Sequence, residues 1–342
     1  MKAAVLHGEN DLRLEEVATP HAGAGEVVVR VKACGVCTTD LKILAGQSTP
    51  RNLPTILGHE VAGTVCEIGE HVGGLELNQR VAVYPIASCG ECFFCRKGKH
   101  SLCLYETGLA HGVDGGFAEY VRIPERLVKL GGVVPIADSL SFELAAMAEP
   151  FSCCLSAFHS APINKGDWVA IIGAGPMGLL NLLVAKAHGA RTIVIDILPE
   201  RLNKARELGA EHLVNGREKD AVEAVRSLTE LGADLVIGAL GDIEVIEKSL
   251  LMVRNGGVFN IFGGPAKGAR LTIDPRWLHY GEIILTGTFG SSLPDFKEAL
   301  RLISNKEVDL KPIISQRLDL GSLLDVVEKT RQHEGLKSVI LF

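Results

Sequence analysis

The distribution of apolar residues divides the chain into two regions. Up to about residue 145 the apolar residues form short runs with the composition of β-strands, separated by glycine, proline or asparagine. The clearest runs cover residues 27–33, 63–68, 80–85 and 117–123. Short strands bounded by turn residues predict a compact, barrel-like β module for this first region.

From residue 168 onward, apolar strands alternate with amphipathic helices. The expected strands cover residues 168–172, 192–196, 211–215, 234–238, 257–263 and 283–287. This alternation is typical of a parallel sheet with helices on both faces. A helical segment over 141–158 connects the two regions. The tail holds a helix over 294–305 and a strand over 338–342 that can pair with either region.

Composition narrows the functional classes. A length of 342 residues gives room for about two domains. The net charge is −6 and no long block of Lys or Arg is present, which argues against a nucleic-acid partner. The most apolar stretch, 168–185, is interrupted by three glycines and a proline. We therefore expect no membrane association and a cytoplasmic protein, in which nine cysteines favour metal binding over disulfides.

Four closely spaced cysteines give the most specific signal. They are Cys89, Cys92, Cys95 and Cys103. Gaps of two residues let consecutive thiolates turn inward around one ion, and a fourth from the following loop completes a tetrahedral zinc site. Because sulfur fills all four positions, none remains for water or substrate, so we predict a structural zinc.

Cys37, His59, Glu60 and Glu149 form a second, sparser set. A thiolate, an imidazole and one carboxylate leave room for water or substrate, as a catalytic zinc requires. Taken alone, however, a cysteine or histidine in a β module is more often a core residue. That interpretation stays open on composition.

A glycine-rich turn follows the strand over 168–172 and opens an apolar helix. Its residues are Gly173, Gly175, Pro176, Met177 and Gly178. Asp196 ends the next strand, 23 residues after Gly173, where a carboxylate would accept hydrogen bonds from a ribose. Because this acid repels the 2′-phosphate of NADP, the motif predicts NAD. The alternative is a glycine-rich turn without a nucleotide.

Taken together, these motifs resemble the zinc-containing medium-chain dehydrogenases along essentially the whole chain. The stretch Gly58-His59-Glu60, with Gly63, Gly69 and Val72 at the following spacings, is similar to the family's zinc signature. The resemblance lies on the branch that includes sorbitol, or polyol, and threonine dehydrogenases.

The resemblance implies an α/β fold that combines a GroES-like β-barrel catalytic domain with a doubly wound Rossmann domain. The expected boundaries are 1–145 for the catalytic domain, with a structural zinc lobe at about 86–104, then 146–289 for the NAD-binding domain. Residues 290–342 would return to the catalytic domain. Two zinc ions and one NAD per chain are expected.

Roles for individual residues also come from the resemblance. Asp40 would accept a hydrogen bond from the ligand His59, and Thr39 would take the hydroxyl proton of the substrate. Lys42 stands where much of the family has a relay histidine, so either Lys42 or water would end the relay. Arg201 matches a position near the adenosine end of the cofactor. Glu60 and Glu149 compete, one as zinc ligand and the other holding its water.

Departures from the family pattern concern the substrate. Polyol and threonine dehydrogenases carry an arginine near the position of Gly290 or just beyond it, whereas residues 287–292 read Gly-Thr-Phe-Gly-Ser-Ser. We therefore expect a secondary alcohol, polyol or sugar alcohol. The alternatives are L-threonine or another amino alcohol, and a catalytically silent nucleotide sensor. A homo-oligomer is expected, a tetramer rather than a dimer.

The remaining cysteines have no role in these motifs. Cys34, Cys66, Cys153 and Cys154 lie in apolar stretches, so we expect them to be small buried hydrophobic residues. Cys153 and Cys154 follow Glu149 closely enough that lining the substrate pocket is an alternative.

Overall fold

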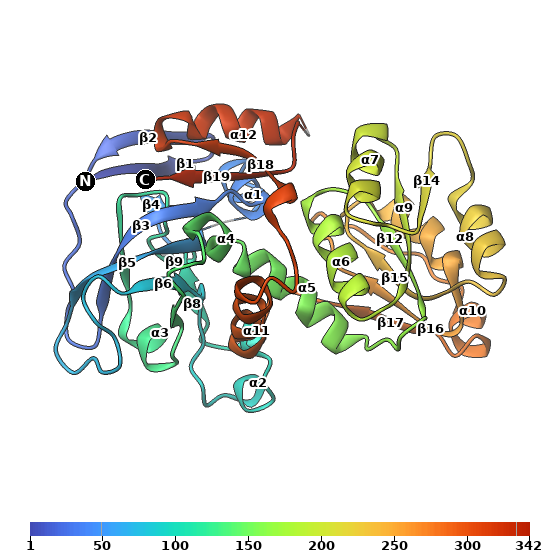
Figure 1. Cartoon of the computed structure of the whole chain (residues 1–342), viewed down its shortest axis with the longest axis horizontal. Coiled ribbons are helices and arrows are strands. Elements are labelled where there is room, and N and C mark those ends of the chain that lie inside the picture. The colour runs from blue at the N-terminus through green and yellow to red at the C-terminus, as the bar shows by residue number, and fades with distance from the viewer. Residues whose placement is uncertain (49, 333) are drawn as a thin grey trace. The chain divides into compact units, whose positions relative to one another are not determined.

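The computed structural model describes residues 1–48, 50–332 and 334–342, and the chain divides into two compact units (Figure 1). Unit 1 comprises Met1–Ser152 and Ser291–Phe342, and unit 2 comprises Cys153–Gly290. The first change of unit falls within helix α5 (Ala148–Ser160). The expected domain boundaries at 145/146 and 289/290 stay predictions.

Unit 2, all of whose residues are described, is built on a six-stranded parallel sheet in the order β14-β13-β12-β15-β16-β17. The strands are β12 (Trp168–Ile172), β13 (Arg191–Asp196), β14 (His212–Asn215), β15 (Ala233–Gly238), β16 (Val253–Ile261) and β17 (Ile284–Gly287). The chain runs outward through β13 and β14 and then returns to β15 on the other side of β12. This reversal defines a doubly wound Rossmann sheet.

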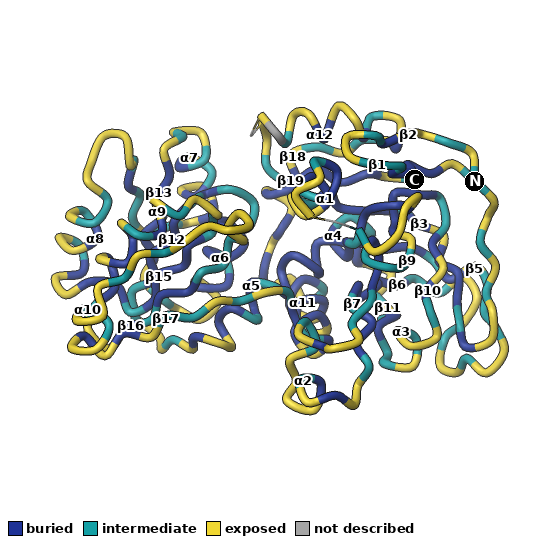
Figure 2. The backbone as a smooth tube through the Cα atoms, turned by 180° about the vertical axis from the view of Figure 1, so that it is seen from behind, coloured by how far each residue is buried: buried dark blue, intermediate teal, exposed yellow. Residues whose placement is uncertain are grey.

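Helices connect the strands of unit 2 and cover its sheet. They are α6 (Pro176–Ala187), α7 (Pro199–Glu207), α8 (Ala221–Thr229), α9 (Ile243–Ser249), the 3-10 helix η2 (Leu250–Met252) and α10 (Pro275–Tyr280). Val169, Ala170, Ile171 and Ile172 are all buried in succession (Figure 2). Because successive side chains of a strand point to opposite faces, both faces of the sheet are covered. The predicted α/β class is confirmed.

Unit 1 contains a large, mostly antiparallel sheet in the order β11-β6-β5-β3-β19-β18, with β10 also paired to β3. Its strands are β3 (Val27–Gly35), β5 (Glu60–Ile68), β6 (Arg80–Val83), β10 (Tyr120–Ile123), β11 (Val133–Pro135), β18 (Ile314–Leu318) and β19 (Lys337–Leu341). Two small sheets join β1 (Lys2–Gly8), β2 (Asp11–Glu16) and β4 (Thr55–Ile56), and β7 (Ile86–Ala87), β8 (Thr107–Leu109) and β9 (Gly112–Val113). These sheets form the β module expected for the first region.

Short helices complete unit 1. They are α1 (Thr38–Leu44), α2 (Phe93–Arg96), η1 (His100–Leu102), α3 (Glu125–Lys129), α4 (Phe142–Ala146), α11 (Leu293–Ser304), η3 (Lys311–Ile313), η4 (Leu320–Ser322) and α12 (Leu323–Arg331). The helical segment expected over 141–158 is present as two helices, α4 and α5, divided at Met147. Pro150 has no N–H to donate to the carbonyl of Ala146, so the hydrogen-bond ladder cannot run through.

The C-terminal strand joins the sheet of unit 1. In β19, Val339, Ile340 and Leu341 pair antiparallel with Gly35, Cys34 and Ala33 of β3. The other edge of β19 pairs in parallel with β18. This arrangement places Lys337, the first residue of β19, near the end of β3 from which the chain enters α1.

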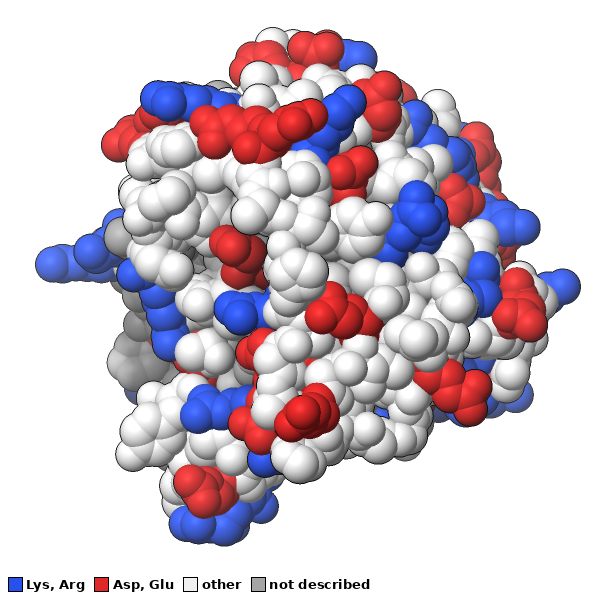
Figure 3. Space-filling view, turned by 90° about the vertical axis from the view of Figure 1, so that its left-hand side faces the viewer, with Lys and Arg blue, Asp and Glu red and all other residues white. Residues whose placement is uncertain are grey.

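The exterior has two features that bear on partners. On the face in Figure 3, acidic and basic side chains are interspersed. Among the described residues, no helix combines the length and the apolar character needed to cross a bilayer.

Candidate functional site

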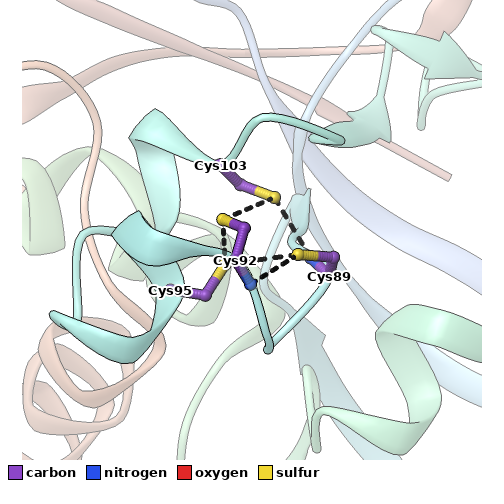
Figure 4. A group of neighbouring side chains, drawn as sticks. All are labelled: Cys89, Cys92, Cys95 and Cys103. Atoms are coloured by element: carbon purple, nitrogen blue, oxygen red, sulfur yellow. Dashed lines mark hydrogen bonds between the residues drawn. The ribbon is translucent and has the colours of Figure 1, made fainter.

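The four clustered cysteines converge on one point (Figure 4). Cys89 precedes α2, Cys92 is its N-cap, Cys95 lies within it, and Cys103 follows η1. The Sγ atom of Cys95 lies 3.8 Å from that of Cys89 and 3.5 Å from that of Cys92, and Cys92 and Cys103 are 3.9 Å apart. A tetrahedral site with Zn–S bonds of about 2.3 Å has sulfur–sulfur edges of about 3.8 Å. The cage therefore fits zinc.

Backbone N–H groups prepare this cage for a cation. The N–H of Cys92 donates to Sγ of Cys89 at 3.3 Å, and the N–H groups of Cys89 and Tyr105 donate to Sγ of Cys103 at 3.2 and 3.4 Å. Backbone donors from Cys95 and Leu104 lower the pKa of Cys92 to about 6. Burial, followed by the hydrogen bond with the thiol of Cys92, raises the pKa of Cys95 to about 12. A bound cation would favour the ionised form of such a thiol.

A second cluster contains Cys37, His59 and Glu60, whose ligand atoms all lie within 4.8 Å of one another. Cys37 follows β3 and is the N-cap of α1, His59 precedes β5, and Glu60 is the first residue of β5. The capping box of α1 fixes Cys37, because the Cys37 N–H donates to Oδ2 of Asp40 at 3.0 Å.

Asp40 also fixes the histidine. Its Oδ1 accepts the backbone N–H of Gly58 at 3.1 Å and lies 3.4 Å from Nδ1 of His59. Contact through Nδ1 leaves Nε2 of His59 for a metal. Burial lowers the pKa of His59, but the negative charges of Asp40 and Cys37 outweigh it and hold this pKa well above its usual value. The same negative surroundings favour a divalent cation.

Glu60 is fully buried, and its two carboxylate oxygens have different surroundings. Oε1 accepts a hydrogen bond from Nζ of Lys337 in a buried ion pair. Oε2 has no hydrogen-bond partner among the described residues. A buried carboxylate oxygen without a partner is costly, and coordination to a cation removes that cost. The residues of this cluster therefore fit a metal ion.

Two residues of this cluster were missed by sequence reasoning. Lys337 directly precedes the predicted strand over 338–342, and only its pairing through β19 brings it to Glu60. Gly35 provides space, since a Cβ at this position would lie 1.8 Å from Oε2 of Glu60. A lysine at the start of an apolar strand was the available signal for the first. The second had no local signal.

The structure places the other expected residues around this cluster. Glu149 is buried in α5 and acts electrostatically on Lys337, but it lies outside the group of three described ligands. Thr39 is exposed, with Oγ1 3.6 Å from Sγ of Cys37. Lys42 is half-buried in the same helix, α1.

The glycine turn of unit 2 has the geometry of a dinucleotide-binding loop. Gly173 has a φ of +96°, and a Cβ on Gly178 would lie 1.8 Å from the carbonyl oxygen of Gly173. Gly175 is the N-cap of α6, and Pro176 and Met177 form the start of its first turn. The turn lies at the end of β12, beside the reversal of strand order, where such sheets bind ligands.

Asp196 supports this loop directly. Its Oδ2 accepts the N–H of Ala174 at 2.6 Å, and its Oδ1 accepts those of Ile197 and Leu198 at 2.7 and 2.9 Å. A carboxylate has about four acceptor positions, so one remains for a ribose hydroxyl. Arg201 lies at the same loop, with Nη1 3.7 Å from where a Cβ on Gly175 would be.

The expectation for the unassigned cysteines is wrong for Cys66, which is exposed. Pairing shifts register between Val28 and Val29, so Cys66 is the extra residue of a β-bulge and turns outward. Cys153 is only partly buried, whereas Cys34 and Cys154 are buried. Sγ of Cys154 donates to the carbonyl of Met177 at 3.7 Å, within unit 2.

Comparison with known proteins agrees with this geometry. Residues 23–133 match the alcohol dehydrogenase GroES-like domain, and residues 176–305 match the zinc-binding dehydrogenase family. A sorbitol dehydrogenase from Bacillus subtilis is 33% identical over 99% of this chain and 97% of its own. An L-threonine 3-dehydrogenase from Rhizobium etli is also 33% identical, over 99% and 98%.

A solved structure shows the same fold. The crystal structure of a zinc-binding dehydrogenase from Sinorhizobium meliloti bound to NADP has a TM-score of 0.94 and 30% identity, covering 100% of this chain and 99% of that one. The chain therefore belongs to the zinc-containing alcohol dehydrogenases of the medium-chain dehydrogenase family. It is an enzyme that acts on CH–OH donors with zinc and a nicotinamide cofactor, which confirms the expected class.

Proposed function

We propose that this enzyme oxidises a secondary alcohol, polyol or sugar alcohol with NAD. The observation that carries the proposal is the cluster of Cys37, His59 and Glu60, in which Oε2 of Glu60 is buried with no hydrogen-bond partner in the described part of the chain. A mixed three-ligand site leaves a position for a substrate oxygen, unlike the four-sulfur cage. Glu60 is then the direct ligand and Glu149 the residue that holds a water.

The chemistry divides between bound groups and the residues of the chain. A bound zinc ion would supply Lewis acidity toward the alcohol oxygen, and bound NAD would accept the hydride. Asp40 orients His59 through Nδ1. Thr39, whose Oγ1 lies near Sγ of Cys37, accepts the proton of the substrate hydroxyl and passes its own proton on. Lys42 or water receives that proton.

A neutral substrate is favoured over threonine. Sequence identity does not decide between the two, because the sorbitol and threonine dehydrogenases are both 33% identical to this chain. The segment 287–292, however, carries no arginine to bind a carboxylate. A charged substrate needs a paired group at the site, since an unpaired carboxylate is costly to desolvate. L-threonine stays the second candidate because the L-threonine 3-dehydrogenase from Rhizobium etli is similar to this chain.

NAD is favoured over NADP by Asp196. This carboxylate holds three backbone N–H groups and faces the loop that would carry the adenosine ribose. A 2′-phosphate beside it would meet negative charge. The relative of known structure from Sinorhizobium meliloti holds NADP, so the ratio of catalytic efficiencies with the two cofactors tests this point.

Two further proposals concern assembly and location. Strand β17 forms one edge of the Rossmann sheet, and Tyr280, Ile284 and Phe289 near it are exposed. These features support a homo-oligomer formed through this edge. The expectation of a tetramer rather than a dimer stays a prediction. The free cysteines of the described residues are compatible with a reducing, cytoplasmic compartment.

The substrate assignment is tested by following NAD reduction across polyols, butanediols, simple alcohols and L-threonine. We expect the highest kcat/KM with a neutral secondary alcohol or polyol. A clear preference for L-threonine would contradict the proposal and establish the second candidate.

A further inference from the structure

We propose that Lys337 is a positioning residue for the catalytic zinc site, which keeps Glu60 a one-oxygen ligand and balances the negative charge around the metal. The inference rests on the proposed zinc site of Cys37, His59 and Glu60. It gives a function to Lys337, a buried lysine that the sequence motifs do not include.

Strand pairing brings the two residues together. Gly35 of β3 pairs with Glu60 of β5 on one side and with Val339 of β19 on the other. Directly paired residues have their side chains on the same face of a sheet, so Glu60 and Val339 share one face. Lys337 precedes Val339 by two residues along the strand, so its side chain lies on that face as well. The exposed fractions of Lys337 and Glu60 are 4% and 0%, and their side chains form an ion pair.

Lys337 brings a positive charge to a cluster of acidic side chains. Its Nζ forms a buried ion pair with Oε1 of Glu60. Cys37 lies in the same group of ligand atoms as Glu60, and Asp40 contacts both Cys37 and His59, so three acidic side chains meet here. Lys337 therefore supplies a fixed positive charge to a site with more acidic groups than a divalent ion neutralises.

The ion pair also restricts how Glu60 can bind a metal. Lys337 occupies Oε1, while the absence of a Cβ on Gly35 gives Oε2 its space. Oε2 is then the oxygen available to zinc. Without Lys337, Oε1 would be free to bind as well, and a two-oxygen carboxylate would fill the coordination position that the substrate oxygen needs.

A purely structural role, tying β19 to β5, is the alternative. Such a role predicts altered stability but no change in metal coordination. The distinction calls for a readout at the metal itself and for a variant that keeps the charge. It also calls for a double substitution. If Lys337 acts on the metal through the carboxylate of Glu60, replacing Lys337 has no further effect once that carboxylate has been replaced.

The experiment replaces zinc by cobalt and records visible absorption, the rate of metal release to a chelator, and kinetics. The variants are K337M, K337R, E60Q and K337M/E60Q, with S338A as the control for a change in β19. We expect weaker visible bands in K337M, as coordination number rises, and slower metal release. We also expect kcat lowered by about 10- to 100-fold with a smaller change in KM.

The other variants separate the outcomes. K337R should restore the wild-type spectrum, S338A should retain it, and K337M should have no further spectral effect in the E60Q background. If K337M is unstable, the visible spectra and metal-release rates of K337R and E60Q are compared with each other instead. An unchanged spectrum and release rate in K337M would overturn the role of Lys337. If Cys37→Ser leaves the metal content of the wild type unchanged, the proposed zinc site itself fails.

Discussion

At the scale of single residues, the cluster of Cys37, His59 and Glu60 depends on the lack of a Cβ at Gly35. Glu60 is buried with Oε2 directly over Gly35, at a distance that no Cβ could share. Its other oxygen is fixed by Lys337. Because Lys337 binds one oxygen of Glu60 and Gly35 lies against the other, the carboxylate has little freedom to move. We therefore expect substitutions at either neighbour to change metal binding.

Gly35→Ala should displace Glu60 and cost the catalytic zinc. The added Cβ would lie 1.8 Å from Oε2, and overpacking of this kind costs about 1–3 kcal/mol. We expect elemental analysis to find one zinc per chain where the wild type has two, and activity to fall at least about 100-fold. Gly8→Ala is the control, since nothing lies within 4 Å of its Cβ position. Two retained zinc ions in Gly35→Ala would refute this account of Glu60.

At the same scale, we predict that Asp196 determines the choice between NAD and NADP. Asp196→Asn removes the charge and weakens the acceptor for Ala174 N–H. A hydrogen bond to a charged group contributes about 1.5–3 kcal/mol, so kcat/KM for NAD should fall about 10- to 100-fold. The efficiency with NADP should fall less, because a repulsive charge is removed too. Initial rates with both cofactors measure this, and an unaltered NAD to NADP ratio would count against the role of Asp196.

At the scale of elements, the sequence predicts what is local. The parallel strands of unit 2 can be recognised in the sequence as apolar runs, and the four cysteines lie within fifteen residues of sequence. The division of 141–158 into α4 and α5 was visible only in Pro150. The contact of Lys337 with Glu60 was not predictable, because it depends on β19 pairing with β3 and β3 with β5. No local pattern encodes which strands pair across such separations.

The lobe around α2 should depend on its own zinc. Cys103→Ser removes one sulfur from the cage, and we expect one zinc per chain to be lost while the catalytic zinc remains. A loss of about 2–3 kcal/mol would lower Tm by about 3–4 °C for a chain of this length. Cys66→Ser is the matched control, because Cys66 is exposed at a bulge. Elemental analysis and thermal unfolding decide, and an unchanged zinc content in Cys103→Ser would contradict a four-sulfur site.

At the scale of the whole molecule, the sheet edge of unit 2 carries the proposed assembly. The side chain of Ile284 on β17 is 57% exposed, and an unpaired strand edge with apolar side chains favours pairing with a second copy. Ile284→Glu should therefore lower the molecular mass in solution, as measured by light scattering. The same mass for variant and wild type would place the interface elsewhere.

The family could be identified from sequence because its motifs are short and specific, whereas the substrate could not. Substrate choice depends on residues that no motif marks. Segment 287–292, for example, lacks the arginine expected from polyol and threonine dehydrogenases. Relatives that act on sorbitol and on threonine are equally similar to this chain. Only measurement of rates separates them.

The central claim is that this chain holds a second zinc ion at Cys37, His59 and Glu60. Anomalous X-ray diffraction at the zinc absorption edge tests it directly. We predict two peaks per chain, one among the four cysteines and one within about 2.3 Å of Sγ of Cys37. A peak at the four cysteines alone, in protein grown with zinc, would contradict the account.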